Sequence, residues 1–194
     1  MNIAEKKRFL GNFLSLATLQ GLNYILPLLT LPYLVRVLGA EKFGLIAFAT
    51  AVVGYFIVLT DYGFNFSATR EVANHRDDKN KLVEIFSSVM IIKVLLLLIS
   101  FVILLFLIIS FEKIGTDALL YILTFGSVVG QVLFPVWFFQ GVERMKYITI
   151  INIISKAIFT VAIFLLVKQT SDYLLVPILT SVGIIVASLI SLYI

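Results

Sequence analysis

The sequence predicts an all-α, polytopic membrane protein, and two observations predict this class. The chain is 61% hydrophobic and only 13% charged, with a mean hydropathy of +1.09, whereas about a quarter of the residues are charged in soluble domains. Apolar runs of the ~20 residues needed to cross a bilayer recur along the whole chain. A soluble domain of 194 residues could not hide so much apolar surface from water.

Six segments are long and apolar enough to span a membrane. The first follows Lys6, Lys7 and Arg8, as the core of a secretory signal would. Its apolar run is longer than the ~7–15 residues of a signal core and lacks an A-x-A-like cleavage site, so we interpret it as a retained helix. The last segment reaches residue 194 without a polar flank, which predicts that these residues are part of a larger protein. The expected helices are residues 9–35, 43–62, 84–111, 117–139, 148–167 and 173–194.

The distribution of Lys and Arg predicts that the amino terminus and the last helix end in the cytoplasm. Nine basic residues then lie on the cytoplasmic side: Lys6, Lys7, Arg8, Arg70, Arg76, Lys79, Lys81, Arg144 and Lys146. Four lie outside: Arg36, Lys42, Lys113 and Lys168. The longest hydrophilic stretch, FSATREVANHRDDKNK (66–81), becomes a cytoplasmic connection, either a solvated loop or an interfacial helix.

Polar side chains form stripes along several of these helices when they are placed at 100° per residue. Such stripes either pack helices together or line a polar interior, and the Gly126–Gly130 pair favours packing. The candidates for a polar interior on the fifth, fourth and first helices are Thr149, Asn152 and Lys156, then Gln131, then Asn12, Gln20 and Asn23.

Three charged residues fall within the expected helices and carry functional hypotheses. A cation near the centre of a bilayer costs about 2.5–3.5 kcal/mol on insertion scales, so it usually faces a cavity or a partner. Lys156 lies ~12 Å along its helix from the cytoplasmic start, too far to reach the surface, and we expect it to line a polar interior. Lys93 lies at a similar height, and either lines the same interior or extends to the interface. Asp61 is either an ion-coupling carboxylate or an interfacial charge that pairs locally.

All four prolines of the chain fall within expected membrane helices: Pro27, Pro32, Pro135 and Pro177. Each removes one backbone hydrogen bond and crowds the preceding turn. Their number predicts bent helices around a cavity, as in transporters. We expect Pro27 and Pro32 to bend the first helix and Arg36 to end it at the outer surface.

The sequence gives no support for catalysis or for nucleic-acid binding. It contains no cysteine and a single histidine, His75, and neither paired carboxylates in the membrane nor a glycine-rich phosphate loop. Its basic residues are scattered between apolar runs instead of forming one patch. The expected interior is cationic, which suits an anionic ligand that is held while it crosses the membrane.

Three segments carry a resemblance to a known family: QGLNYILPLLTLPYLVRVLGAEKFG (20–44), DYGFNFSATREVA (61–73) and PVWFFQGVERMKYITIINIISK (135–156). They resemble the Wzx-type flippases of bacterial polysaccharide synthesis, within the multidrug/oligosaccharidyl-lipid/polysaccharide exporter superfamily. The similarity runs through nearly the whole chain, and the three motifs occur in the family's order.

The resemblance implies a membrane transporter, not an enzyme, with about twelve helices in two six-helix lobes. This chain would be the amino-terminal lobe, without the second. Such flippases move undecaprenyl-diphosphate-linked oligosaccharides from the cytoplasmic to the periplasmic leaflet of the bacterial inner membrane, by alternating access. No cofactor is expected, and coupling to a proton or sodium gradient is proposed for relatives. The implied partners are the lipid-linked glycan and membrane lipid, with a polysaccharide polymerase and a chain-length regulator as further candidates.

Three alternatives stay open at this point. A multidrug exporter of the same superfamily has the same lobe plan, but it exports cations. A flippase of the lipid-linked peptidoglycan precursor shares the anionic head of the substrate. A scaffold that recruits a glycan polymerase is the third alternative, but it would not explain the lysine inside the membrane. Increased drug susceptibility on loss of the protein would identify the multidrug exporter, and cell-wall lysis on depletion would identify the precursor flippase. Unchanged turnover of the lipid-linked glycan would identify the scaffold.

Overall fold

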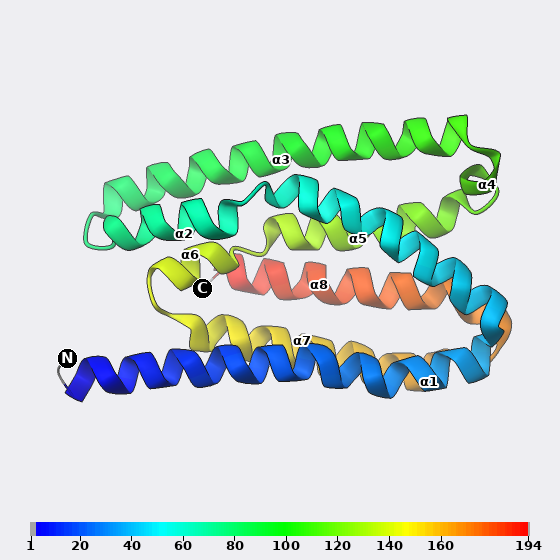
Figure 1. The fold of residues 1–194 in the computed structure, drawn as a ribbon, viewed down its shortest axis with the longest axis horizontal. Helices are drawn as coiled ribbons and strands as arrows, with labels where there is room; N and C mark the ends of the chain where they lie inside the picture. Colours follow the sequence, from blue (N-terminus) through cyan, green and yellow to red (C-terminus); the bar gives the residue numbers. More distant parts are fainter. Residues whose placement is uncertain (1–2, 194) are drawn as a thin grey trace.

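The protein is a bundle of helices that lie side by side along one long axis (Figure 1). The computed structural model describes residues 3–193; upstream of Leu28 it describes only the side chains of Ala17 and Ile25, and at position 147 only the backbone. No strand occurs within this range, which confirms the all-α class. Both ends of the chain lie at one end of the bundle, here called the terminal end; α1 turns at the opposite end, here called the elbow end (Figure 1).

Helix α1 (Ile3–Asp61) consists of two arms that meet at Gly39. Gly39 has φ 77° and ψ 164°, a conformation that residues with a Cβ rarely adopt, so the helix breaks here. The two arms correspond to the helices expected at 9–35 and 43–62. The backbone stays helical through Pro32, so the expectation that Arg36 ends the first arm was wrong, and Gly39 ends it.

The hydrophilic stretch after α1 forms a helix, α2 (Phe64–Asn74), instead of a loop. Tyr62 and Gly63 precede it with positive φ angles of 43° and 82° and turn the chain out of α1. Helix α3 (Lys79–Ser110) begins before the expected residue 84, because the side chain of Asp78 accepts hydrogen bonds from the backbone N–H groups of Asn80 and Lys81. Its 32 residues span ~48 Å.

The second half of the chain contains the remaining elements. These are α4 (Glu112–Gly115), α5 (Ala118–Leu133), α6 (Val136–Gly141), α7 (Met145–Leu166), the 3₁₀ helix η1 (Thr170–Leu174) and α8 (Leu175–Tyr193). Pro135 lies between α5 and α6 and divides the helix expected at 117–139, since it cannot donate a backbone hydrogen bond. Pro177 lies where η1 gives way to α8, so it accompanies a change of helix type near the start of that helix.

Five helical stretches in the described part of the chain are long and apolar enough to cross a membrane, and two of them contain a turn between successive helices. They are residues Leu28–Asn74, Lys79–Ser110, Ala118–Gly141, Ile148–Leu166 and Thr170–Tyr193. The first includes the Gly39 elbow, so two of the six expected spans appear here as one kinked helix. Large apolar side chains face outward on these helices, for example Leu28, Phe106, Ile109 and Leu165. Exposed apolar surface of this extent suits a lipid environment.

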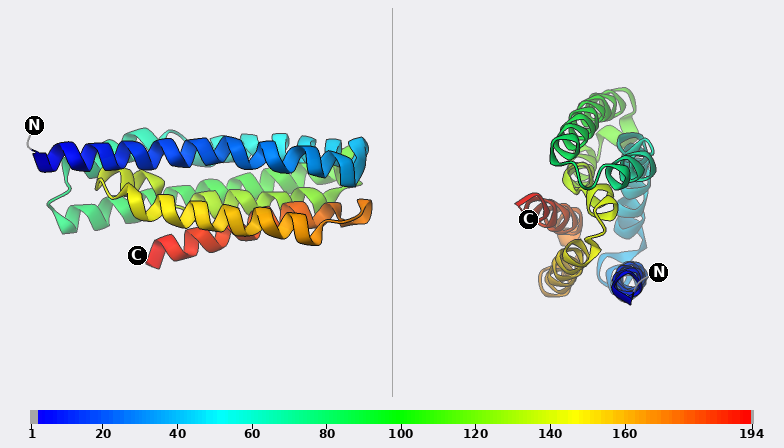
Figure 2. Two further views of the ribbon diagram at one scale, coloured as in Figure 1. Left: turned by 90° about the horizontal axis from the view of Figure 1, so that it is seen from below. Right: turned by 90° about the vertical axis from the view of Figure 1, so that its left-hand side faces the viewer.

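Helices α5 and α8 contact each other closely. Figure 1 shows α7 and the first arm of α1 on one side of this pair and α3 on the other, and Figure 2 shows the carboxyl end of α8 at the outside of the bundle. A Cβ on Gly130 would lie 2.5 Å from Cγ2 of Ile184, and one on Gly126 would lie 2.8 Å from Cβ of Ser181. Only glycine permits this approach, which confirms that the Gly126–Gly130 pair packs helices.

Candidate functional site

A cavity of about 250 Å³ lies between α1, α5, α7 and α8 and brings together polar side chains from all four helices. We call it the α7 cavity. Its apolar lining comes mainly from Phe134, Phe159, Ile163 and Ile184. Its polar lining is Thr30 from α1, Gln131 from α5, Asn152, Ser155, Lys156 and Thr160 from α7, and Thr180 from α8.

Helix α7 supplies most of the polar wall. Asn152, Lys156 and Thr160 follow one another at intervals of four residues and therefore share one face of the helix. Lys156 is half-buried, and it is the one charged residue among the described residues that line the cavity. The polar wall therefore offers an ammonium group flanked by an amide and a hydroxyl, a combination that suits an anionic or hydroxyl-rich ligand.

Two polar atoms near Lys156 are buried without a hydrogen-bond partner among the described residues. They are Oδ1 of Asn152, which belongs to the cavity lining, and Oγ1 of Thr149, one turn earlier on α7. Buried polar atoms of this kind are costly and are normally satisfied by protein, water or ligand. A hydroxyl-bearing ligand in the cavity would satisfy the Asn152 amide.

The cavity walls are held by side-chain hydrogen bonds to backbone carbonyls of neighbouring helices. Oγ of Ser155 donates to the carbonyl of Gly183 over 2.6 Å and ties α7 to α8. Oγ of Ser181 donates to the carbonyl of Leu123 over 2.7 Å and ties α8 to α5. These two serines thus position the helices that carry the polar wall.

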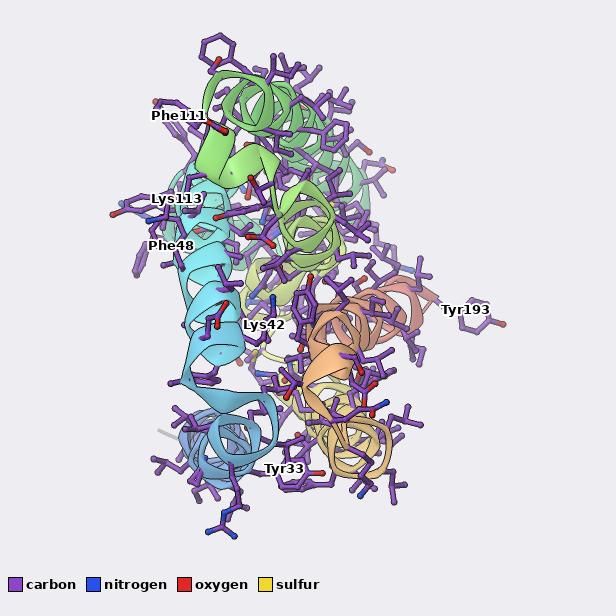
Figure 3. The ribbon with its side chains drawn as sticks, turned by 90° about the vertical axis from the view of Figure 1, so that its right-hand side faces the viewer. Tyr33, Lys42, Phe48, Phe111, Lys113 and Tyr193 are labelled. Atoms are coloured by element: carbon purple, nitrogen blue, oxygen red, sulfur yellow. The ribbon has the colours of Figure 1, made fainter. Side chains whose placement is uncertain are left out.

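The elbow end of the bundle is fastened by aromatic side chains. The hydroxyl of Tyr33, in the first arm of α1, donates to the carbonyl of Val167 over 2.7 Å. Nζ of Lys42 lies 4.8 Å from the ring centroid of Tyr173, within the range of a cation–π contact. Figure 3, viewed from this end, shows Tyr33 between α1 and α7 and Lys42 directed from α1 toward the middle of the bundle. Both sides of the Gly39 elbow are therefore tied to the segment that joins α7 to α8.

Lys93 and Asp61 lie together and apart from the α7 cavity. Nζ of Lys93 is 3.7 Å from Oδ1 of Asp61, and the two side chains are 5% and 29% exposed. The pair joins α3 to the last residue of α1. Lys93 therefore faces a carboxylate from a neighbouring helix, and neither residue belongs to the cavity lining.

The structure places the other sequence candidates as follows. Gln131, Asn152 and Lys156 meet in the α7 cavity, whereas Thr149 is buried beside it. The side chains of Asn12, Gln20, Asn23 and Pro27 lie outside the described part of the chain. Sequence reasoning missed Ser155 and Thr180, whose place on a cavity wall depends on how α7 and α8 pack.

No group of three His, Cys, Asp or Glu residues that could hold a metal ion occurs among the described residues.

The chain is similar to known proteins over nearly its whole length. Residues 9–194 match the family described as "Polysaccharide biosynthesis protein". A protein of Escherichia coli (strain K12) named "Putative O-antigen transporter" is 37% identical over 181 residues, which cover 93% of this chain and 44% of that protein. A protein of the same name from Shigella dysenteriae is 30% identical over 192 residues, which cover 94% of this chain and 46% of that protein.

The chain thus spans less than half the length of these curated relatives. No solved structure matches it significantly. The match extends over all three sequence motifs and over every helix of the bundle except the first turns of α1. The resemblance stated from those motifs is confirmed, and the chain belongs to the polysaccharide biosynthesis protein family.

Proposed function

We propose that this chain forms one six-helix lobe of a flippase that moves undecaprenyl-diphosphate-linked oligosaccharides across the bacterial inner membrane. A second lobe, outside these residues, would supply the opposite wall, and the two would open alternately to each side of the membrane. The relatives named as O-antigen transporters support a polysaccharide-related cargo. Surface polysaccharide synthesis would be the process served.

The observation that carries this proposal is the α7 cavity with Lys156 in its wall. A diphosphate-linked glycan is anionic at its head and rich in hydroxyls in its sugars, while its prenyl chain belongs in lipid. Lys156 can offset the phosphate charge, and Asn152 and Gln131 can exchange hydrogen bonds with hydroxyls. A cationic drug would meet the same ammonium group with repulsion, which disfavours the multidrug alternative.

The membrane orientation in this proposal places the terminal end in the cytoplasm. Asp77, between α2 and α3, and Thr116, after α4, are exposed at opposite ends of α3, and the chain has no cysteine of its own. A membrane-impermeant maleimide should label Thr116→Cys in intact cells, and Asp77→Cys only after permeabilisation. The reverse pattern would show that the orientation is inverted.

Two further elements complete the proposal. A proton or sodium gradient would drive the cycle, with Asp61 as the candidate carboxylate. A polysaccharide polymerase and a chain-length regulator would receive the product on the outer side. No resident cofactor is part of the mechanism.

The function is tested in the native host. Deleting the gene of the intact protein should cause the lipid-linked oligosaccharide to accumulate, as measured by mass spectrometry, while polysaccharide disappears from the cell surface. Normal levels of both, with new sensitivity to cationic drugs, would instead support an exporter. Lysis with accumulation of the peptidoglycan precursor would support the precursor flippase.

A further inference from the structure

A second, separate core lies at the terminal end, between α2, α3 and α6. We call this unit the clasp and define it as residues 64–74, 79–90 and 136–141. Val72 and Trp137 are fully buried in it, with Ile85 and Val89 beside them. The rings of Phe86 and Trp137 lie 5.7 Å apart between centroids. This core is distinct from the one between α5, α8 and α1. Phe138 of α6 packs against it and also against a neighbouring core that contains Phe139 and Met145.

The contact between α2 and α6 is too close for any residue except glycine at position 141. A Cβ on Gly141 would lie 2.5 Å from Cγ1 of Val72 and 2.9 Å from the carbonyl oxygen of Thr69. Next to it, Oγ1 of Thr69 donates to the carbonyl of Trp137 over 3.1 Å. Helices α2 and α6 are thus fixed together, although they lie in different parts of the chain.

An ion pair fastens the clasp at the point where α6 leads into α7. Nη1 of Arg76, just after α2, lies 2.8 Å from Oε1 of Glu143. Glu143 has a φ of 57°, a left-handed conformation that is uncommon outside glycine and is kept when its surroundings favour it. Backbone hydrogen bonds close this turn, from the N–H of Glu143 to the carbonyl of Gln140 and from the N–H of Arg144 to the carbonyl of Phe139. Arg76 therefore ties an already formed turn at the end of α6 to the segment that follows α2.

The segments that precede and follow α6 in the chain both contribute to the wall of the α7 cavity. Phe134, the residue before Pro135 and α6, lines the cavity, as does Gln131 one turn earlier. On the other side, Arg144 is the residue before α7, which carries Asn152 and Lys156. A shift of α6 must consequently move Phe134, the end of α5 and the start of α7.

We propose that the clasp sets the position of the cavity wall at the α5–α6 junction, and that Arg76 is a positioning residue for the transported group. Arg76 acts through Glu143 and α6 without touching the ligand. This inference rests on the proposed function for what the cavity carries. Its structural part, that α2 controls the cavity wall through α6, does not depend on the identity of the cargo.

The transport test compares Arg76→Ala with Arg70→Ala in the intact protein, reconstituted in vesicles with its lipid-linked glycan. Arg70 lies on α2 and is exposed, so its replacement removes the same charge without removing the pair with Glu143. We expect the apparent KM to rise by up to about fivefold for Arg76→Ala, the most that an ion pair with both side chains more than a third exposed is expected to contribute, and to stay unchanged for Arg70→Ala. Arg76→Lys keeps the positive charge, so its apparent KM should lie close to that of the unmutated protein.

A second readout needs no transport. Gln131→Cys places a thiol in the cavity wall, and residues 1–194 contain no cysteine. Any cysteine elsewhere in the intact protein is first replaced by serine. Its alkylation rate should change several-fold when Arg76→Ala is added and stay constant when Arg70→Ala is added. Equal rates in all three proteins would overturn the inference, even if the protein proves to be a flippase. If the alkylation rate changes but the intact protein transports no lipid-linked glycan, the structural role of the clasp stands and the proposed cargo is wrong.

The charge-swapped double variant, Arg76→Glu with Glu143→Arg, covers the case in which Arg76→Ala accumulates poorly. It keeps an ion pair at the same place, so the alkylation rate of Gln131→Cys should return toward that of the unswapped protein. A folded double variant whose alkylation rate still differs several-fold from that of the unswapped protein would overturn the role of the pair.

Discussion

Replacing Lys156 by alanine in the intact protein should reduce glycan export by about ten- to a hundredfold while leaving membrane insertion intact. The reason is the loss of the one charged group among the described residues of the α7 cavity wall. A hydrogen bond to a charged group contributes about 1.5–3 kcal/mol, and each 1.4 kcal/mol corresponds to about tenfold in affinity. Surface polysaccharide and lipid-linked glycan, measured per unit of protein in the membrane, give the result.

Two variants serve as controls for this prediction. Lys156→Arg keeps the positive charge and should retain part of the export. Lys168→Ala removes a lysine just beyond the other end of α7, where Nζ donates to the carbonyl of Phe164 at the exposed surface, and it should export normally. Export at the unmutated level by Lys156→Ala would refute the role of this lysine.

Neutralising Asp61 alone should destabilise the protein more than neutralising Asp61 and Lys93 together. Asp61→Asn leaves the buried side chain of Lys93, 5% exposed, without its counter-charge inside a membrane helix. Breaking a buried pair costs about 3–5 kcal/mol, and we expect ~3 kcal/mol here because the Asp61 side chain is 29% exposed. The double variant Asp61→Asn, Lys93→Met removes both charges and should recover most of this loss. Thermal unfolding of the purified intact protein measures all three.

The same series also separates a structural pair from an ion-coupling carboxylate. If Asp61→Asn is as stable as the unmutated protein but its transport no longer responds to a proton or sodium gradient, Asp61 acts in ion coupling. If the double variant is no more stable than Asp61→Asn, the two charges do not depend on each other. Asp77→Asn, at an exposed position between α2 and α3, controls for the replacement of an aspartate by asparagine.

The polar wall of α7 could be predicted from the sequence because it depends on one helix alone. The spacing of Asn152, Lys156 and Thr160 fixes their common face before any neighbour is known. The environment of Lys93 could not be predicted in the same way. Lys156 and Lys93 look alike in sequence, each a lysine inside an apolar helix, and only helix packing decides that one lines a cavity and the other meets Asp61.

The serines of α8 show the same limit. Pro177, Ser181 and Ser188 share one face of α8 at 100° per residue. The hydroxyls of Ser181 and Ser188 nevertheless donate to backbone carbonyls, and Thr180 lines the cavity. Helix breaks were also hard to place. The conspicuous prolines of α1 drew attention to residues 27–32, whereas the backbone breaks at Gly39, because a single positive φ suffices to turn a helix.

The length of α3 has a practical consequence for studying this protein. Its ~48 Å, from 32 residues, exceed the ~30 Å of a bilayer's hydrocarbon core, and Figure 1 shows α2 and the first turns of α3 extending past the end of α5. A unit with its own core therefore lies past the end of α5, and the first arm of α1 extends at least as far (Figure 1). This unit offers an epitope for an antibody fragment, whose added mass would guide particle alignment in electron cryomicroscopy of the intact protein.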